Sequence, residues 1–183
     1  MANTTHLSIL KQGADTWNKW RAENFNSESS SSERPDLSGA DLIGAKLYNV
    51  NLNGVDLSCA NLSGAKLYNV NLDGADLSGA NLSGADLTSA KLCNANLSHA
   101  NLGAALLKGA MLFRTKLICS NLGGADLTDA WLTETDLTGA NTCGANLTKT
   151  RVLQRTIGVS LVTKIMHFFE GNHPETSLAA TLR

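Results

Sequence analysis

The chain has 183 residues, 43% of them hydrophobic, and its 15 Lys and Arg nearly balance its 16 Asp and Glu, leaving a net charge of −1 at pH 7. No basic stripe runs along the sequence, which argues against direct nucleic-acid binding. No stretch approaches the ~20 consecutive apolar residues of a membrane-spanning helix, and the first ten residues lack the basic and apolar regions of a secretory signal. We therefore expect a cytoplasmic protein without a membrane span.

Residues 1–23 are predicted to form an N-terminal amphipathic helix that acts as a cap. Residues three and four apart mark one helical face between Thr5 and Ala22, namely Leu7, Leu10, Ala14, Trp17 and Arg21. Trp17 and Trp20 are the candidate capping residues, because an open solenoid end needs cover and both are too large for a narrow interior. The alternative is a partner-binding helix that leaves the end bare. Residues 24–34 include four consecutive serines and predict a flexible loop.

From residue 35 to residue 157 the sequence is organised in units of five. Leu stands at every fifth position from Leu37 to Leu137, and 22 of the 24 pentads through Val152 have a central Leu. A period of five fits neither an α-helix nor a flat alternating strand. Two positions before each centre, from Ala40 to Thr150, the residue is always Ala, Val, Thr or Ser. Residues two apart in extended backbone point the same way, so we expect both to face inward.

The remaining three positions of each pentad complete one side of a coil. The polar residue between the two inward ones faces water, and the last two residues turn the corner, where Gly tolerates the positive φ of a type II turn. The run Ala75-Asp76-Leu77-Ser78-Gly79 shows the whole unit. It resembles the pentapeptide repeat family, whose motif is a small residue, Asp or Asn, Leu or Phe, a small polar residue, then Gly.

This resemblance covers residues 36 to about 152 and implies a right-handed quadrilateral β-helix with 20 residues per coil. The recurrence of residues 45–52 without change at 65–72 supports the 20-residue period independently. The predicted fold class is thus an all-β solenoid of about six coils with short helical segments at both ends. Pure Leu-type repeats of this kind are common in cyanobacteria and other bacteria.

Residues 158–183 are predicted to form a C-terminal helical segment. An apolar face runs through Leu161, Ile165, Phe168 and Phe169, and Gly171 is a plausible stop. The adjacent Phe168 and Phe169 need cover, so they are also candidate capping residues. The segment either caps the last coil or pairs with the same segment of a second chain. In some relatives a C-terminal segment mediates dimers, so the resemblance implies a homodimer as one alternative.

No catalytic, cofactor-binding or metal site is predicted. The chain has no phosphate-binding loop, nucleophile elbow or metal-ligand spacing, and its Asp residues follow the repeat. The coil places His99 one level from Cys119, but no further ligand is in reach, so we expect ordinary corner residues. The four cysteines lie too far apart or on opposite faces for a disulfide within the rod, which fits a reducing cytoplasm.

Residues 20 apart are predicted to stack in columns along the rod. One outward column consists entirely of asparagines and predicts an amide ladder: Asn61, Asn81, Asn101, Asn121 and Asn141. Three charged pairs are placed in register by the same spacing, Arg114 with Glu134, Lys116 with Asp136, and Asp129 with Lys149.

One group of outward residues predicts an interaction surface, which we call the aromatic patch. It comprises Leu106, Met111, Phe113, Trp131 and Arg151. Apolar residues stand there in positions that elsewhere hold Asp or Asn, and contiguous exposed apolar surface marks an interaction site. The patch is covered by the chain's own C-terminal segment, by a second copy, or by a foreign protein.

These features predict a non-catalytic structural or protein-interaction scaffold with an unidentified partner. The resemblance implies one alternative, because some family members mimic double-stranded DNA and bind DNA gyrase. Such mimicry requires a strongly anionic rod. Residues 35–152 carry ten Asp and Glu against eight Lys and Arg, a net charge of −2, which disfavours this alternative.

Overall fold

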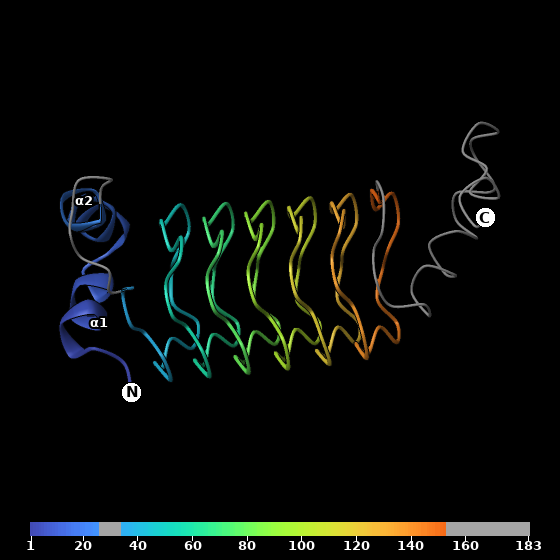
Figure 1. Cartoon of the computed structure of the whole chain (residues 1–183), viewed down its shortest axis with the longest axis horizontal. Helices are drawn as coiled ribbons and strands as arrows, with labels where there is room; N and C mark the ends of the chain where they lie inside the picture. The colour runs from blue at the N-terminus through green and yellow to red at the C-terminus, as the bar shows by residue number, and fades with distance from the viewer. Residues whose placement is uncertain (26–33, 153–183) are drawn as a thin grey trace.

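The computed structural model describes residues 1–25 and 34–152. Two helices at the N-terminus are followed by a long stack of coils, which Figure 1 shows from the side. The predicted C-terminal segment with Phe168 and Phe169, and most of the predicted loop at 24–34, lie outside the described residues. Among the described residues, no helix has both the length and the apolar character needed to cross a membrane.

The N-terminal segment predicted as one helix forms two, α1 (Thr4–Lys11) and α2 (Ala14–Asn24). The break falls at Gly13, whose φ of 111° is incompatible with a helix interior. The Asn3 side chain caps α1 by accepting hydrogen bonds from the backbone N–H groups of Thr5 and His6. The prediction of a single helix was wrong because the apolar spacing of three and four continues across a turn.

The repeat region forms a parallel β-helix. Each outward residue before a central Leu makes an isolated parallel bridge with the residue 20 positions further on, as Asp36 does with Asp56. The four columns of bridges begin at Asp36, Asp41, Lys46 and Asn51, one for each side of the coil. The backbone N–H of the central Leu donates to the carbonyl one coil on; for Leu37 and Asp56 the N–O distance is 2.7 Å.

The core is a ladder of Leu with Ala or Val beside it, as predicted. Leu87 and Ala85, in the middle of the rod, are both 0% exposed. Nearer the C-terminal end of the described rod, hydroxyl residues replace alanine at four inward positions: Thr115, Ser120, Thr135 and Thr150. The hydroxyl of Thr115 donates to the carbonyl of Leu92 at 2.7 Å, so the buried oxygen has a partner.

The second corner residue of each pentad has left-handed backbone. This confirms the predicted positive φ, and Gly139, with a φ of 69°, is a representative case. A Cβ on Gly139 would lie 3.0 Å from the Sγ atom of Cys119, a tight contact that the exposed sulfur would have to relieve by shifting. Non-glycine residues such as Asn49 and His99 adopt the same conformation at other corners. Their strain is tolerated because hydrogen bonds to the next coil hold each corner in place.

The predicted columns are confirmed for the amides and for one of the charged pairs. Each side-chain amide of the Asn ladder donates to the preceding one, with distances of 3.3 Å for Asn81 to Asn61 and 2.9 Å for Asn141 to Asn121. Arg114 and Glu134 form an ion pair at 2.7 Å. The other two predicted pairs, Lys116 with Asp136 and Asp129 with Lys149, form no ion pair in the described structure. Ion pairs between exposed side chains contribute little to stability, and Arg114 is held in addition by its contact with the Phe113 ring.

Candidate interaction surfaces

The structure brings the predicted aromatic patch together on one side of the rod. Met111 bridges Trp131, and Trp131 bridges Arg151, so the three stand in one axial column. Phe113 occupies the corner that follows Met111, and Leu106 lies in the neighbouring column. Leu106 is 46% exposed and Trp131 is 41% exposed, while Met111 and Phe113 are half-buried.

Two arginines lie on the aromatic rings of the patch. The guanidinium carbon of Arg151 is 4.7 Å from the centre of the Trp131 ring, and that of Arg114 is 4.6 Å from the centre of the Phe113 ring. Arg114 also pairs with Glu134. The 20-residue spacing predicts the ion pair of Arg114 but not its stacking on Phe113, although the two residues are chain neighbours. The patch therefore combines apolar faces with cations held at its surface.

A carboxylate borders the patch. Asp126 bridges Leu106 along the rod, and hydrogen bonds from the Thr128 hydroxyl and backbone N–H hold the pKa of Asp126 below its ordinary value. Asp126 therefore stays ionised at neutral pH. A partner that covers Leu106 must leave this carboxylate in water or supply a cation or hydrogen-bond donor to it.

Among the described residues, the titratable groups outside the patch form no cluster suited to a metal ion. Burial, with a further contribution from Asp73, raises the pKa of the Cys93 thiol, which makes it less reactive at neutral pH. All four cysteines are free. Within the described ranges, no group of three or more His, Cys, Asp and Glu is placed to hold a metal ion.

The N-terminal helices contact the open end of the first coil. Trp17 is 0% exposed, and its indole Nε1 donates to the carbonyl of Asn51 at 2.7 Å. Asn18 accepts from the backbone N–H of Asn51 at 2.8 Å, and Arg21 donates to the carbonyl of Asn53 at 2.6 Å. These side chains make the contacts that a preceding coil would make. Trp20 is half-buried and packs on Trp17, with ring centres 5.0 Å apart.

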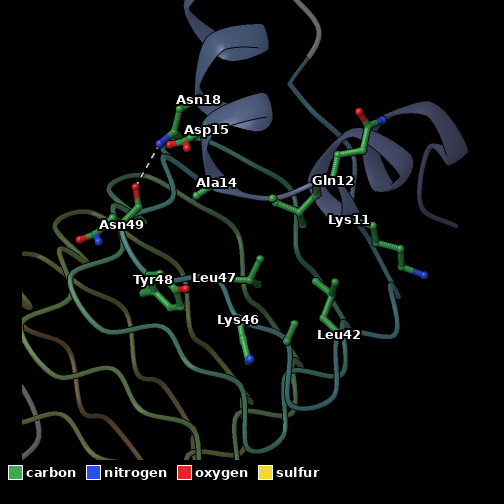
Figure 2. Close-up of a pocket in the computed structure, with 13 residues that line it drawn as sticks. Lys11, Gln12, Ala14, Asp15, Asn18, Leu42, Lys46, Leu47, Tyr48 and Asn49 are labelled. Carbon is green, nitrogen blue, oxygen red and sulfur yellow. Dashed lines mark hydrogen bonds between the residues drawn. The ribbon is translucent and has the colours of Figure 1, made fainter.

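Hydrogen bonds from the N-terminal segment also cover a second side of the first coil, but a groove remains beside a third side. The backbone N–H of Asn3 donates to the carbonyl of Asp36, and the backbone N–H of Asp36 donates to the Nδ1 atom of His6. Between the α1–α2 junction and residues 42–49 lies an open groove of about 600 Å³, shown in Figure 2. We call it the N-terminal groove. The repeat does not predict this groove, although the 20-residue spacing does place Tyr48, which lines it, in line with Tyr68, on which Tyr48 stacks.

Comparison with known proteins identifies the repeat. The family model for pentapeptide repeats matches in eight copies at residues 36–74, 71–109, 94–129 and 120–152, well over half of the chain. No curated protein sequence matches the chain.

Among solved structures, a pentapeptide repeat protein, Rfr23, from the cyanobacterium Cyanothece 51142 is 28% identical, with a TM-score of 0.50 and coverage of 79% of this chain and 99% of that one. HetL, a pentapeptide repeat protein from the cyanobacterium Nostoc sp. strain PCC 7120, is 35% identical over 64% of this chain and 62% of its own, with a TM-score of 0.23. QnrB1, a plasmid-mediated fluoroquinolone resistance protein, is 20% identical, with a TM-score of 0.43 and coverage of 73% of this chain and 85% of that one. The chain therefore belongs to the pentapeptide repeat family and has the right-handed β-helix of that family.

Proposed function

We propose that this protein is a non-catalytic scaffold that binds another protein through the aromatic patch. One observation carries the proposal: Met111, Trp131 and Arg151 stand in line on the rod surface, with Trp131 41% exposed and Arg151 stacked on its ring. Exposed aromatic rings and arginine are the residue types enriched at the energetic centres of protein interfaces. The rigid coil backbone holds them at fixed spacing, which limits the entropy lost on binding.

The proposal includes the finer architecture and the compartment. We propose a quadrilateral rod of about six coils over residues 35–157, and six residues in each column of bridges support it. Residues 1–23 act as the N-terminal cap, supported by the contacts of Trp17 with the first coil. Residues 158–183 cap the other end or form a dimer. The four free cysteines support a reducing compartment such as the cytoplasm.

Substitution of Trp131 by Asp is expected to abolish binding to the partner, because a charge replaces the largest apolar surface of the patch. The protein and the variant are immobilised, and the proteins that each captures from the native cell are compared. Light scattering of both then tests self-association, for which the wild type would have twice the chain mass of 19.3 kDa.

The matched control for this experiment is Asn71→Asp, which introduces the same charged residue in the same column three coils away. It should behave like the wild type in both measurements. If Trp131→Asp captures the same proteins as the wild type and both are monomers, the patch is not a binding surface.

The charge of the rod argues against the alternative of a DNA mimic that binds gyrase. The column that begins with three aspartates, Asp36, Asp56 and Asp76, continues with Asn96 and Lys116. No acidic stripe therefore runs along the described rod on this side, as the regular phosphates of DNA would require. The resistance protein QnrB1 shares only 20% identity with this chain.

We accordingly expect the purified protein not to inhibit DNA supercoiling by gyrase at micromolar concentration. The assay compares supercoiled product formed with and without the protein at low and at physiological salt. Inhibition that weakens as salt rises would show that the short Asp36–Asp76 column is sufficient for binding, because screening removes interactions between exposed charges.

A further inference from the structure

The first coil has backbone hydrogen-bonding groups that the N-terminal helices do not cover. In the second coil, Lys66 donates to the carbonyl of Ala45, and the carbonyls of Lys66 and Tyr68 accept from Leu47 and Asn49. The equivalent groups of the first coil are the N–H and carbonyl of Lys46 and the carbonyl of Tyr48. Within the part of the chain that the structure describes, these three have no hydrogen-bond partner. They form an open strand edge, which is a template for another strand.

The N-terminal groove lies directly over this edge. Its floor is formed by residues 42–49, and its wall by the end of α1 and the start of α2, as Figure 2 shows. Leu47 in the floor and Leu10 in the wall form an apolar base that is only 3% and 2% exposed, and the half-buried Ala45 and Ala14 leave apolar surface beside it. The groove thus offers backbone donors and acceptors beside apolar side chains, the combination that binds extended peptides by strand addition.

The helices restrict what can occupy the groove. They stand at the same end of the rod (Figure 1). Their hydrogen bonds cover the sides that begin with Asp36 and Asn51. An α-helix is about 10 Å across, so the flat end of a second rod cannot reach the edge. A single extended chain needs only the width of one strand, about 4.8 Å, and can lie between the floor and the helices.

The column above Lys46 determines the charge of the occupant. Lys46 bridges Lys66, so two exposed cations stand in line, and the next residue in the column is Asp86. Like charges stacked at this spacing repel each other. A carboxylate on the other side of Lys46 would relieve that repulsion.

The neighbouring column favours an aromatic residue. Tyr48 and Tyr68 are stacked, with ring centres 5.2 Å apart and an angle of 11° between the planes. Tyr48 is 40% exposed and lines the groove. A third ring placed over Tyr48 would extend the stack and bury the exposed ring face.

The geometry points to a peptide-binding site in the N-terminal groove. It takes an extended segment of a partner protein with the order small residue, Asp or Glu, Leu, aromatic residue. The segment adds one strand to the first coil: its Leu N–H donates to the Lys46 carbonyl, its small residue accepts from the Lys46 N–H, and its carboxylate lies beside the Lys46 ammonium. The site is separate from the aromatic patch, and its partner need not be the same protein.

A labelled peptide Gly-Ala-Glu-Leu-Tyr-Gly, titrated with the full-length protein and followed by fluorescence anisotropy, tests the site. We expect saturable binding that weakens about tenfold or more when the peptide's Leu amide is N-methylated, because that amide donates to Lys46. N-methylation of the Glu amide is the matched control and should leave binding unchanged, since that N–H points away from the coil. Failure to bind at about 1 mM, or equal sensitivity to both methylations, would overturn the proposal.

Protein variants locate the site. Lys46→Glu should weaken binding of this peptide severalfold, and a peptide with Lys in place of Glu should bind that variant well. Lys91 is also exposed but stands in another column, so Lys91→Glu should change the binding of neither peptide. Trp131→Asp should bind the peptide normally, which separates this site from the aromatic patch. Lys46 is exposed, so its replacement leaves the core intact. Equal effects of Lys46→Glu and Lys91→Glu would place the peptide elsewhere and refute the assignment.

Discussion

Leu87→Ala is expected to lower the free energy of unfolding by about 2–5 kcal/mol, the cost of removing a fully buried Leu and leaving a cavity. Leu87 is 0% exposed and lies in the middle of the rod, with Leu67 and Leu107 one coil away on either side along the same ladder. The coils are closed by bridges on all four sides, so neighbouring backbone cannot collapse into the space. Urea unfolding of the wild type and the variant measures the loss.

The control is the adjacent residue, Asp86, which points outward. Its Oδ1 atom accepts from the backbone N–H of Thr88 at 3.1 Å. Asp86→Asn keeps an oxygen in that position, and so we expect a change within about 0.5 kcal/mol. Equal losses at residues 86 and 87 would contradict the assignment of inward and outward positions.

The second large effect is expected at the N-terminal end. Trp17→Ala should cost about 3–5 kcal/mol of local stability, because it removes the largest buried side chain of the cap and leaves the carbonyl of Asn51 without its donor. In a solenoid each level contacts mainly its neighbours, so the loss should be confined to the first coils. Amide hydrogen exchange should therefore quicken at Leu52 but not at Leu92.

Two further variants separate the contributions of Trp17. Trp17→Phe keeps most of the apolar volume and loses the indole donor, so about 1–2 kcal/mol should be lost. Lys19→Ala, on the exposed side of α2, should change nothing measurable. If Trp17→Ala leaves exchange at Leu52 unchanged, the helices do not stabilise the rod and the capping proposal is wrong.

The repeat could be predicted from the sequence because the position of a residue within its pentad determines whether its side chain faces inward or outward. Spacing alone assigned Leu87 to the core, Asp86 to the surface, and Asn101 to an amide ladder, and the structure agrees. The break at Gly13 was missed, since the positions of Leu10, Ala14 and Trp17 fit a continuous helix as well as a broken one.

The candidate sites were predictable only in part, for a related reason. The columns of the aromatic patch follow from the 20-residue period, so Met111 and Trp131 were placed correctly relative to each other. The N-terminal groove depends on where α1 and α2 dock against the first coil. That docking is set by single contacts, such as Trp17 with Asn51, between residues 34 positions apart and outside any repeat. Such contacts follow no periodic pattern, so the sequence period could not predict them.

The four buried hydroxyls of the core have a consequence for the order in which the protein folds. From Val50 to Ala110 every inward side chain is pure hydrocarbon, whereas Thr115, Ser120, Thr135 and Thr150 are buried only with their oxygens hydrogen-bonded. Contacts between coils span only 20 residues, so loop closure costs little and collapse can begin anywhere. Loose contact between side chains is enough to stabilise the coils from Val50 to Ala110, because hydrophobic burial needs no exact geometry. The coils that contain the buried hydroxyls are stabilised only once those hydroxyls have formed their hydrogen bonds. Assembly should therefore start in the middle of the chain and reach the hydroxyl-bearing coils last.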